Sequence, residues 1–173
     1  MKQILTVFLV LIGLSAAAQV QHAKGILSAE LDGGLSPYGY YVGAGASYYL
    51  GRNFYVKAVA NYEYKSKTTN GGLDRVQYSY YLDVPAAFTF FSFNDLVYFN
   101  IVGGLSVGYY LEQPIETFEL PSSFQYGGLV GGEIEVFVNS KIAILLNTNS
   151  KYLFGKGFGD KRFYYGMGVK YSF

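Results

Sequence analysis

Apolar and polar side chains alternate with a period of two along most of the chain, and the alternation is clearest in the last eleven residues. One face of this segment carries Phe163, Tyr165, Met167, Val169, Tyr171 and Phe173. The other face carries Tyr164, Gly166, Gly168, Lys170 and Ser172. Successive side chains of a β-strand point to opposite faces of the strand. The pattern therefore predicts a strand with one face toward lipid and the other toward a crowded polar interior.

Seven earlier segments show the same alternation, so the sequence predicts eight strands. The predicted strands cover residues 25–33, 40–50, 54–64, 76 to the turn at 92, 96–110, 124–137, 142–152 and 163–173. In the seventh of these, Leu145 shares its phase with Asn147, Asn149 and Lys151, which makes that segment the least regular. Pro85 lacks a backbone donor and predicts a β-bulge in the fourth strand.

The connections between these strands alternate between short and long. Tight turns are predicted at residues 51–53, 92–95 and 139–141, and longer loops near residues 34–39, 66–75, 112–123 and 154–161. Outer-membrane barrels have an even number of antiparallel strands, short periplasmic turns and longer external loops. The predicted fold is therefore all-β, an eight-stranded antiparallel up-and-down transmembrane β-barrel with both termini in the periplasm.

Charged residues within the predicted strands fall in the phase opposite to the apolar residues. They are Lys57, Glu63, Asp83, Glu133, Glu135, Lys151 and Lys170. A Lys or Arg on the lipid face at mid-membrane costs roughly 2–4 kcal/mol, so charges of a membrane barrel gather inside. A soluble barrel of the lipocalin type would have the reverse arrangement. These seven residues are predicted to form an interior polar network in which the lysines balance the acids.

Composition agrees with a barrel in lipid. Charged residues make up 14% of the chain, against about a quarter in soluble domains. The formal net charge of +1 gives no electrostatic reason to expect nucleic acid as a partner. The chain has no cysteine, which excludes a disulfide framework, a thiolate metal site and a lipoprotein anchor.

The first eighteen residues have the features of a secretory signal peptide. Lys2 precedes an apolar run at residues 4–14, and three alanines at residues 16–18 supply the small side chains of a cleavage site. Cleavage after Ala18 would leave residues 19–173 as the barrel domain. A secreted chain of this kind is expected in the outer membrane of a Gram-negative type of cell, with outer-membrane lipid around it.

Few residues of the sequence suggest catalysis. The interior of an eight-stranded barrel is just wide enough for side chains, so an open pore is not expected. Glu133 and Glu135 share an inward face and could be an acid and base pair of the glycosidase type, but an ion network is favoured. His22, the only histidine, lies before the first strand and is expected to be solvated. No catalytic, cofactor or metal site is predicted.

Charges near the predicted loops, such as Lys65, Lys161 and Glu112, could form a binding surface for a partner. A solvated rim is the simpler interpretation of the same residues. Loops on a rigid scaffold are nonetheless where a partner would be expected to bind.

The closing strand resembles the C-terminal strand of bacterial outer-membrane barrels, whose terminal aromatic residue is read by the barrel assembly machinery. The resemblance implies that Met167, Val169, Tyr171 and Phe173 form such an assembly signal.

The last ninety or so residues also resemble the TraO family of conjugative transposon proteins. The similar features are Val84 with Pro85, the strand from residue 97 to 108, the run Tyr126, Gly127 and Gly128, Glu133, Glu135, the run Leu145, Leu146 and Asn147, Leu153, Gly155, and the ending at residues 165–170. This resemblance implies a non-enzymatic envelope component of a conjugative DNA-transfer apparatus, with other transfer proteins as partners. The alternative is a general OmpX-like structural or adhesive outer-membrane barrel.

Overall fold

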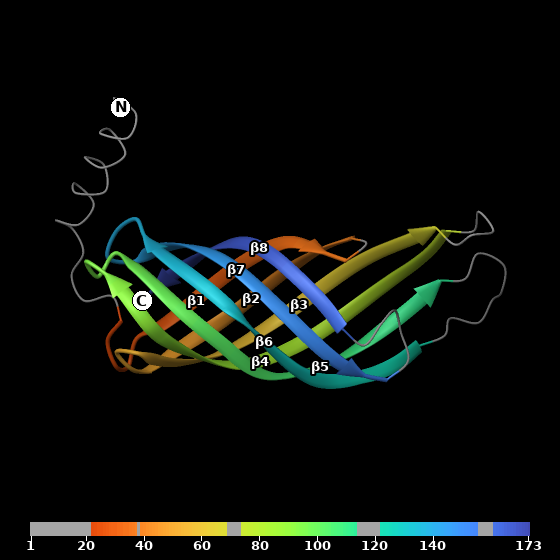
Figure 1. The fold of residues 1–173 in the computed structure, drawn as a ribbon, viewed down its shortest axis with the longest axis horizontal. Helices are drawn as coiled ribbons and strands as arrows, with labels where there is room; N and C mark the ends of the chain where they lie inside the picture. Colours follow the sequence, from red (N-terminus) through yellow and green to blue (C-terminus); the bar gives the residue numbers. More distant parts are fainter. Residues whose placement is uncertain (1–21, 38, 69–73, 114–121, 156–160) are drawn as a thin grey trace, which may run out of the picture.

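The computed structural model describes residues 22–37, 39–68, 74–113, 122–155 and 161–173 (Figure 1). The predicted signal peptide, residues 1–18, lies outside the described residues, as do the central parts of three predicted loops. Within the described ranges, no helix is long and apolar enough to cross a membrane.

Eight strands form a closed barrel in which each strand pairs with its neighbours in chain order. The strands are β1 (Leu27–Ser36), β2 (Gly39–Gly51), β3 (Phe54–Thr68), β4 (Asp74–Phe93), β5 (Val97–Gln113), β6 (Ser122–Phe137), β7 (Ile142–Phe154) and β8 (Lys161–Ser172). Every pair is antiparallel, and β1 closes the barrel against β8. The predicted fold class is confirmed, with strand bounds that differ at several ends.

The first connection is much shorter than predicted. Strand β1 continues through Gly33 and Gly34 to Ser36, so only residues 37–38 separate β1 from β2. Gly34 is paired on both sides, with Tyr41 and with Gly166. A Cβ at Gly34 would overlap the backbone of β8, so glycine here permits close pairing of strands and does not break the strand.

The bulge in β4 is not at Pro85, and that prediction was wrong. Pro85 lies opposite Gly104 of β5, and the register between β3 and β4 is the same on both sides of the proline. The register shift lies instead between Thr89 and Phe91. As a consequence, Phe90 and Phe91 are both exposed on the outer surface, 58% and 53% respectively. A proline removes a donor on one side of the strand only, which the ladder tolerates without inserting a residue.

The tight turn between β4 and β5 has the expected position. Asn94 and Asp95 have φ angles of 52° and 51°, in the left-handed region. Asn and Asp tolerate this region better than other residues with a side chain. Turns with positive φ match the twist of paired strands, so these two residues suit a tight hairpin.

The two faces of the barrel wall have opposite character. Large apolar side chains point outward and are exposed, for example Leu31 at 66%, Leu105 at 69% and Met167 at 66%. Charged side chains point inward, and Glu135 and Lys170 have no exposed surface. This arrangement is the reverse of a soluble barrel and gives the outer surface the apolar belt that lipid requires.

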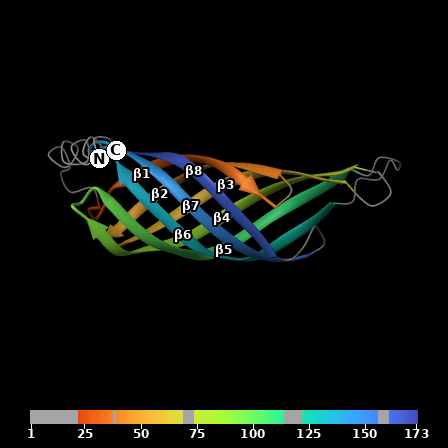
Figure 2. The same ribbon diagram turned by 45° about the horizontal axis from the view of Figure 1, so that its top comes forward.

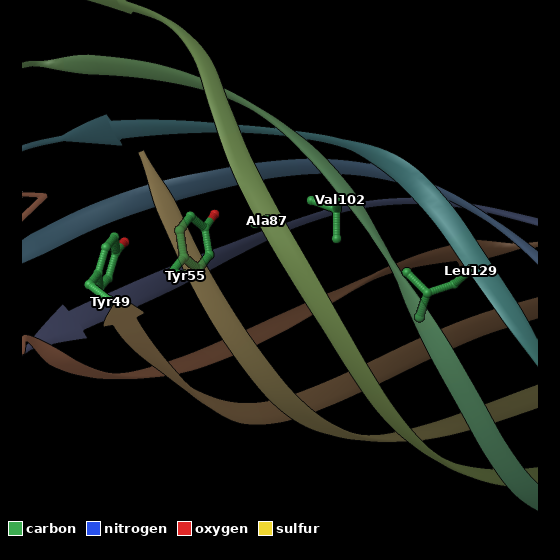
Figure 3. Close-up of a cluster of buried hydrophobic side chains, with 5 residues drawn as sticks. All are labelled: Tyr49, Tyr55, Ala87, Val102 and Leu129. Atoms are coloured by element: carbon green, nitrogen blue, oxygen red, sulfur yellow. The ribbon is translucent and has the colours of Figure 1, made fainter. Parts of the chain in front are cut away.

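An apolar layer lies inside the barrel among the polar side chains. It consists of Tyr49, Tyr55, Ala87, Val102 and Leu129, all of which are buried (Figure 3). Further along the interior, inward glycines make room for tyrosines. A Cβ at Gly108 would overlap the ring of Tyr81, and one at Gly166 would overlap the hydroxyl of Tyr41. The interior is therefore filled by side chains and not by an open channel.

Strands β3 to β6 extend beyond the others at the end with the long connections (Figure 1, Figure 2). Pairing of β2 with β3 ends at Gly39 and Lys65, whereas β3 and β4 remain paired to Thr68 and Asp74. On the other side, pairing of β6 with β7 ends at Tyr126 and Phe154, although β6 begins at Ser122. We call this four-stranded extension the projecting sheet. Its two sides, residues 66–68 of β3 and 122–124 of β6, have no ladder partner in β2 or β7 within the described residues.

Phe173 lies at the opposite end of the barrel, where the short turns are. Its backbone N–H donates to the Leu27 carbonyl at 3.0 Å, and its ring packs edge-on against Tyr171 with centroids 5.2 Å apart. The ring is 70% exposed. Few contacts that stabilise the barrel therefore depend on this side chain.

Substitution of Phe173 is expected to separate assembly in cells from stability. Phe173→Ala should change the stability of the purified, refolded barrel by no more than about 1–1.5 kcal/mol, because the ring is exposed. It should lower the amount of folded barrel in the outer membrane about tenfold if the terminal aromatic is an assembly signal. The folded fraction is measured by gel mobility with and without boiling. Phe93→Ala, an exposed aromatic at the same end of the barrel, is the matched control, and an equal loss with both variants would contradict an assembly signal.

Candidate functional site

Most of the charged side chains inside the barrel fall into two clusters, one toward each end. The basal cluster lies toward the short turns and consists of Glu30, Lys57, Glu133, Glu135 and Lys170. The rim cluster lies toward the long connections and consists of Glu63, Lys65 and Arg162. The pair of Asp83 and Lys151 is separate from both clusters. The alternation of each strand places these side chains inside, and the stagger of the strands decides which of them meet.

Lys170 is central to the basal cluster. Its Nζ lies 2.5 Å from Glu135 Oε1, 3.7 Å from Glu133 Oε1 and 3.9 Å from Glu30 Oε2. Lys57 completes the cluster, with Nζ 2.7 Å from both Glu30 Oε1 and Glu133 Oε2. None of these five residues is more than 8% exposed. Charges removed from water in this way are tolerated only because each has partners of opposite sign and hydrogen bonds.

Tyrosines supply the remaining hydrogen bonds of the basal cluster. The Tyr55 hydroxyl lies 2.6 Å from Glu133 Oε1 and 2.8 Å from Glu135 Oε1. The Tyr49 hydroxyl lies 3.2 Å from Glu135 Oε2. The ammonium of Lys170 also lies 4.6 Å from the centroid of the Tyr55 ring, within the range of a cation–π contact. Tyr49 and Tyr55 thus belong to the apolar layer of Figure 3 by their rings and to the basal cluster by their hydroxyl groups.

His22 is buried in the basal cluster, so the prediction of a solvated terminal residue was wrong. Only 1% of it is exposed, and its ring stacks on Tyr98 with centroids 3.8 Å apart. Its Nε2 lies 3.0 Å from Glu135 Oε2, and its Nδ1 lies 3.2 Å from the Arg52 carbonyl oxygen. The described residues before β1, 22–26, therefore place the His22 side chain inside the short-turn end of the barrel. Nothing in the local sequence signals this, because the partners of His22 are distant along the chain.

The rim cluster contains a lysine that was expected at a solvated rim. Lys65 is only 1% exposed, and its Nζ lies 3.2 Å from Glu63 Oε1. Arg162 reaches the same carboxylate, with Nη1 2.9 Å from Glu63 Oε2, and also contacts the Tyr81 hydroxyl and Gln125. Lys65 has the same phase as Lys57 and Glu63, so continuing the alternation of β3 by one more inward position would have placed it inside.

Between the clusters, Asp83 pairs with Lys151 at 2.6 Å and accepts a hydrogen bond from Asn61 Nδ2 at 2.8 Å. The seven charged residues predicted inside are thus placed in three groups. Lys57, Glu133, Glu135 and Lys170 meet, Asp83 and Lys151 meet, and Glu63 binds partners that the prediction did not include. The further interior charges are Glu30, Asp32, Lys65 and Arg162.

The chemistry available to this interior is limited. Glu133 and Glu135 are 3% and 0% exposed, and both are bound to lysine and tyrosine. The Tyr55 hydroxyl and the Lys170 ammonium each contact both carboxylates and lie where a substrate of a glycosidase would have to bind. Among the side chains that the structure describes, no group of three or more His, Cys, Asp or Glu is arranged to hold a metal ion. The arrangement suits a sealed structural core.

The fold is that of small outer-membrane β-barrels of known structure. The chain is similar to the N-terminal β-barrel domain of OprF from Pseudomonas aeruginosa, with 12% identity, 87% of this chain and 98% of that chain covered, and a TM-score of 0.64. It is similar to Ail, the attachment invasion locus protein of Yersinia pestis, with 12% identity, 87% and 99% covered, and a TM-score of 0.61. It is also similar to the outer membrane protein OprG from Pseudomonas aeruginosa, with 15% identity, 90% of this chain and 99% of that chain covered, and a TM-score of 0.53. No known family model and no curated protein sequence matches the chain.

These likenesses show the fold and nothing finer. The chain is an eight-stranded barrel of the outer-membrane type, as the OmpX-like alternative expected. Membership of the TraO family is not shown by any of these comparisons.

Removing the ammonium of Lys170 should destabilise the barrel strongly. Lys170→Met keeps a long side chain but leaves Glu135 without its closest cation, so we expect the free energy of unfolding to fall by about 3–5 kcal/mol. Urea-induced unfolding of the purified barrel in detergent micelles, followed by tyrosine fluorescence, measures the loss. Lys141→Met, at an exposed turn with one weak ring contact to Tyr171, should cost no more than about 1 kcal/mol. Similar losses for the two variants would show that the buried ion pairs are not what stabilises the interior.

Proposed function

We propose that this chain is a non-enzymatic scaffold of the outer membrane whose projecting sheet binds a partner outside the cell. In this proposal residues 1–18 direct export, and residues 19–173 fold into the membrane with the barrel assembly machinery. The short turns and both termini then lie in the periplasm. The basis for this orientation is the general rule that short turns are periplasmic and long connections external.

The apolar belt and the filled interior support a scaffold. Exposed side chains such as Leu105 and Met167 suit contact with acyl chains, and the interior charges are sealed by one another. Among the described residues, most of the acidic and basic side chains of the interior are buried and bound to one another, so they do not form a catalytic set that a substrate could reach. A rigid barrel of this kind offers a platform and not a channel or a catalytic site.

The observation that carries the proposal is the pair of free sheet edges on the projecting sheet. Within the described residues, 66–68 on one side and 122–124 on the other continue β3 and β6 past the last ladder pairs with their neighbours β2 and β7. A free strand edge presents backbone N–H and C=O groups that can pair with an extended segment of another protein. The projecting sheet therefore offers two places at which a partner could add a strand. Ail is named for attachment and invasion, but at 12% identity its likeness supports the fold and does not decide the role.

Shortening the projecting sheet tests this proposal. Residues 66–68 pair with residues 74–76, so deleting both sets together removes one extended end and keeps the pairing of the remainder. Cells that carry the shortened chain should attach to each other and to protein-coated surfaces about tenfold less than cells with the full chain. Attachment is counted with equal amounts of folded barrel, judged by gel mobility. Lys161→Ala, an exposed position outside the projecting sheet, is the control. Attachment that is unchanged both by this shortening and by deletion of residues 122–124 with their partners 109–111 in β5 would refute the proposal.

A role in conjugative transfer is the second candidate; its basis is the resemblance of parts of the sequence to the TraO family, although no family model matches the chain. Those parts include the Val84 and Pro85 pair and the closing residues 165–170. This candidate adds transfer proteins as partners and requires no contact with DNA. It also predicts a gene located among other transfer genes, whereas a general structural or adhesive barrel predicts an unlinked gene.

Mating efficiency from a donor that lacks the gene tests the second candidate. Transfer should fall in the deletion, return with the full chain on a plasmid, and stay low with a chain that lacks Phe173, because that chain would not assemble. Unchanged transfer in the deletion would eliminate the conjugative role. That result would leave the attachment experiment, which does not involve transfer, unaffected.

A further inference from the structure

A small cavity of about 50 Å³ lies within the barrel interior. Most of the residues that line it have polar side chains, and they come from β1 to β8, including Asp32, Asn61, Asp83, Asn147 and Asn149. A water molecule needs roughly 10–15 Å³ of such space, so the cavity has room for about three or four particles of that size. The question is which species fits the groups that line it.

Three of the residues that line this cavity have a buried side-chain oxygen without a hydrogen-bond partner among the described residues. These oxygens are Asp32 Oδ1, Asp83 Oδ1 and Asn149 Oδ1. Asp83 as a whole is only 6% exposed. Buried acceptors without a partner are unfavourable, and they are normally satisfied by water or by an ion. All three are oxygen atoms, which are the ligands that hard cations prefer.

Two acceptors converge at one point of the wall, above Gly43. Asp32 of β1 pairs with Gly43 of β2, and Gly43 pairs with Asn61 of β3, so the three residues form one row across the strands. A Cβ at Gly43 would meet both Asp32 Oδ1 and Asn61 Oδ1. The Asn61 amide is oriented by its Nδ2, which donates to Asp83 Oδ2 at 2.8 Å. Two acceptor oxygens brought near one point repel each other, and a cation or a donor bound to both would offset that repulsion.

Asp32 is also the interior carboxylate without an ion-pair partner among the described residues. Its other oxygen, Oδ2, accepts hydrogen bonds from Asn147 at 2.9 Å and Tyr41 at 3.3 Å, both neutral groups. The nearby cations are already bound elsewhere. Lys57 is held by Glu30 and Glu133, and Lys151 is held by Asp83. The two cations of the rim cluster both bind Glu63.

We propose that this cavity binds one monovalent metal cation, sodium or potassium, with Asp32 Oδ1 and Asn61 Oδ1 as its protein ligands. The Asp83 and Asn149 oxygens complete the shell through water. One unpaired carboxylate matches one positive charge, which favours a monovalent over a divalent ion. The ion would lock the first three strands together across Gly43.

The unfolding rate of the purified full chain in micelles tests the site. The rate in urea is measured at equal ionic strength in sodium chloride, potassium chloride and N-methylglucamine chloride, whose organic cation is too large for the cavity. A bound ion that stabilises only the folded barrel should slow unfolding about tenfold at a concentration near ten times its dissociation constant. Comparing sodium with potassium identifies the preferred ion. Equal rates in all three salts would overturn the proposal and leave water as the occupant.

Three variants show whether the effect belongs to this cavity. Asp32→Asn removes the charge, and Gly43→Ala keeps the charge but fills the space between the two oxygens, so each should abolish the difference between salts. Asp95→Asn, at an exposed turn, should retain the difference. Broadening of the sodium-23 resonance gives an independent measure of binding, which should be lost in Gly43→Ala even if Asp32→Asn does not fold. A salt effect that survives in both cavity variants would also overturn the proposal.

Discussion

The interaction on which the rest of the structure depends is the group of ion pairs around Lys170. The ammonium of this residue, on the last strand, lies 2.5 Å from Glu135 and within 4 Å of Glu133 and of Glu30 on the first strand. Together with Lys57, it makes charges acceptable in a place without bulk water. Truncating one member of such a group leaves buried charge unbalanced, which costs several kcal/mol. The group also links β8 to β1 and β6, so these ion pairs can form only when the barrel has closed in the correct register.

This constraint determines the outer surface as well. A shift of one residue in the register of a strand turns its inward side chains outward. In β8 such a shift would place Lys170 in lipid and Val169 among the carboxylates. Both changes are unfavourable, so the interior charges and the apolar belt specify the same register. The inward glycines fit this scheme, because Gly108 and Gly166 leave room for the tyrosines Tyr81 and Tyr41.

The same features limit what the protein can do. An interior sealed by ion pairs and by His22 leaves little space for a substrate or for passage of a solute. This is why we propose that a partner binds at the projecting sheet, where β3 to β6 extend past their neighbours (Figure 1). The ligand site inferred above Gly43 differs in kind, because it would stabilise the barrel from within. In the proposed function, the barrel is the rigid part in the membrane and the projecting sheet is the part that binds a partner.

The sequence by itself determined the number of strands, their antiparallel order and the face of each strand that turns inward. These features follow from local alternation, because the direction of a side chain in a strand depends only on its neighbours. The tertiary structure alone decided which inward groups meet. The burial of His22, the partners of Lys65 and the convergence of Asp32 and Asn61 over Gly43 depend on strand stagger and on closure of β1 against β8. The place of the bulge, at Thr89 and not at Pro85, was decided in the same way. Such contacts join residues far apart along the chain, and the local alternation of side chains does not show which distant residues will be neighbours in the folded barrel.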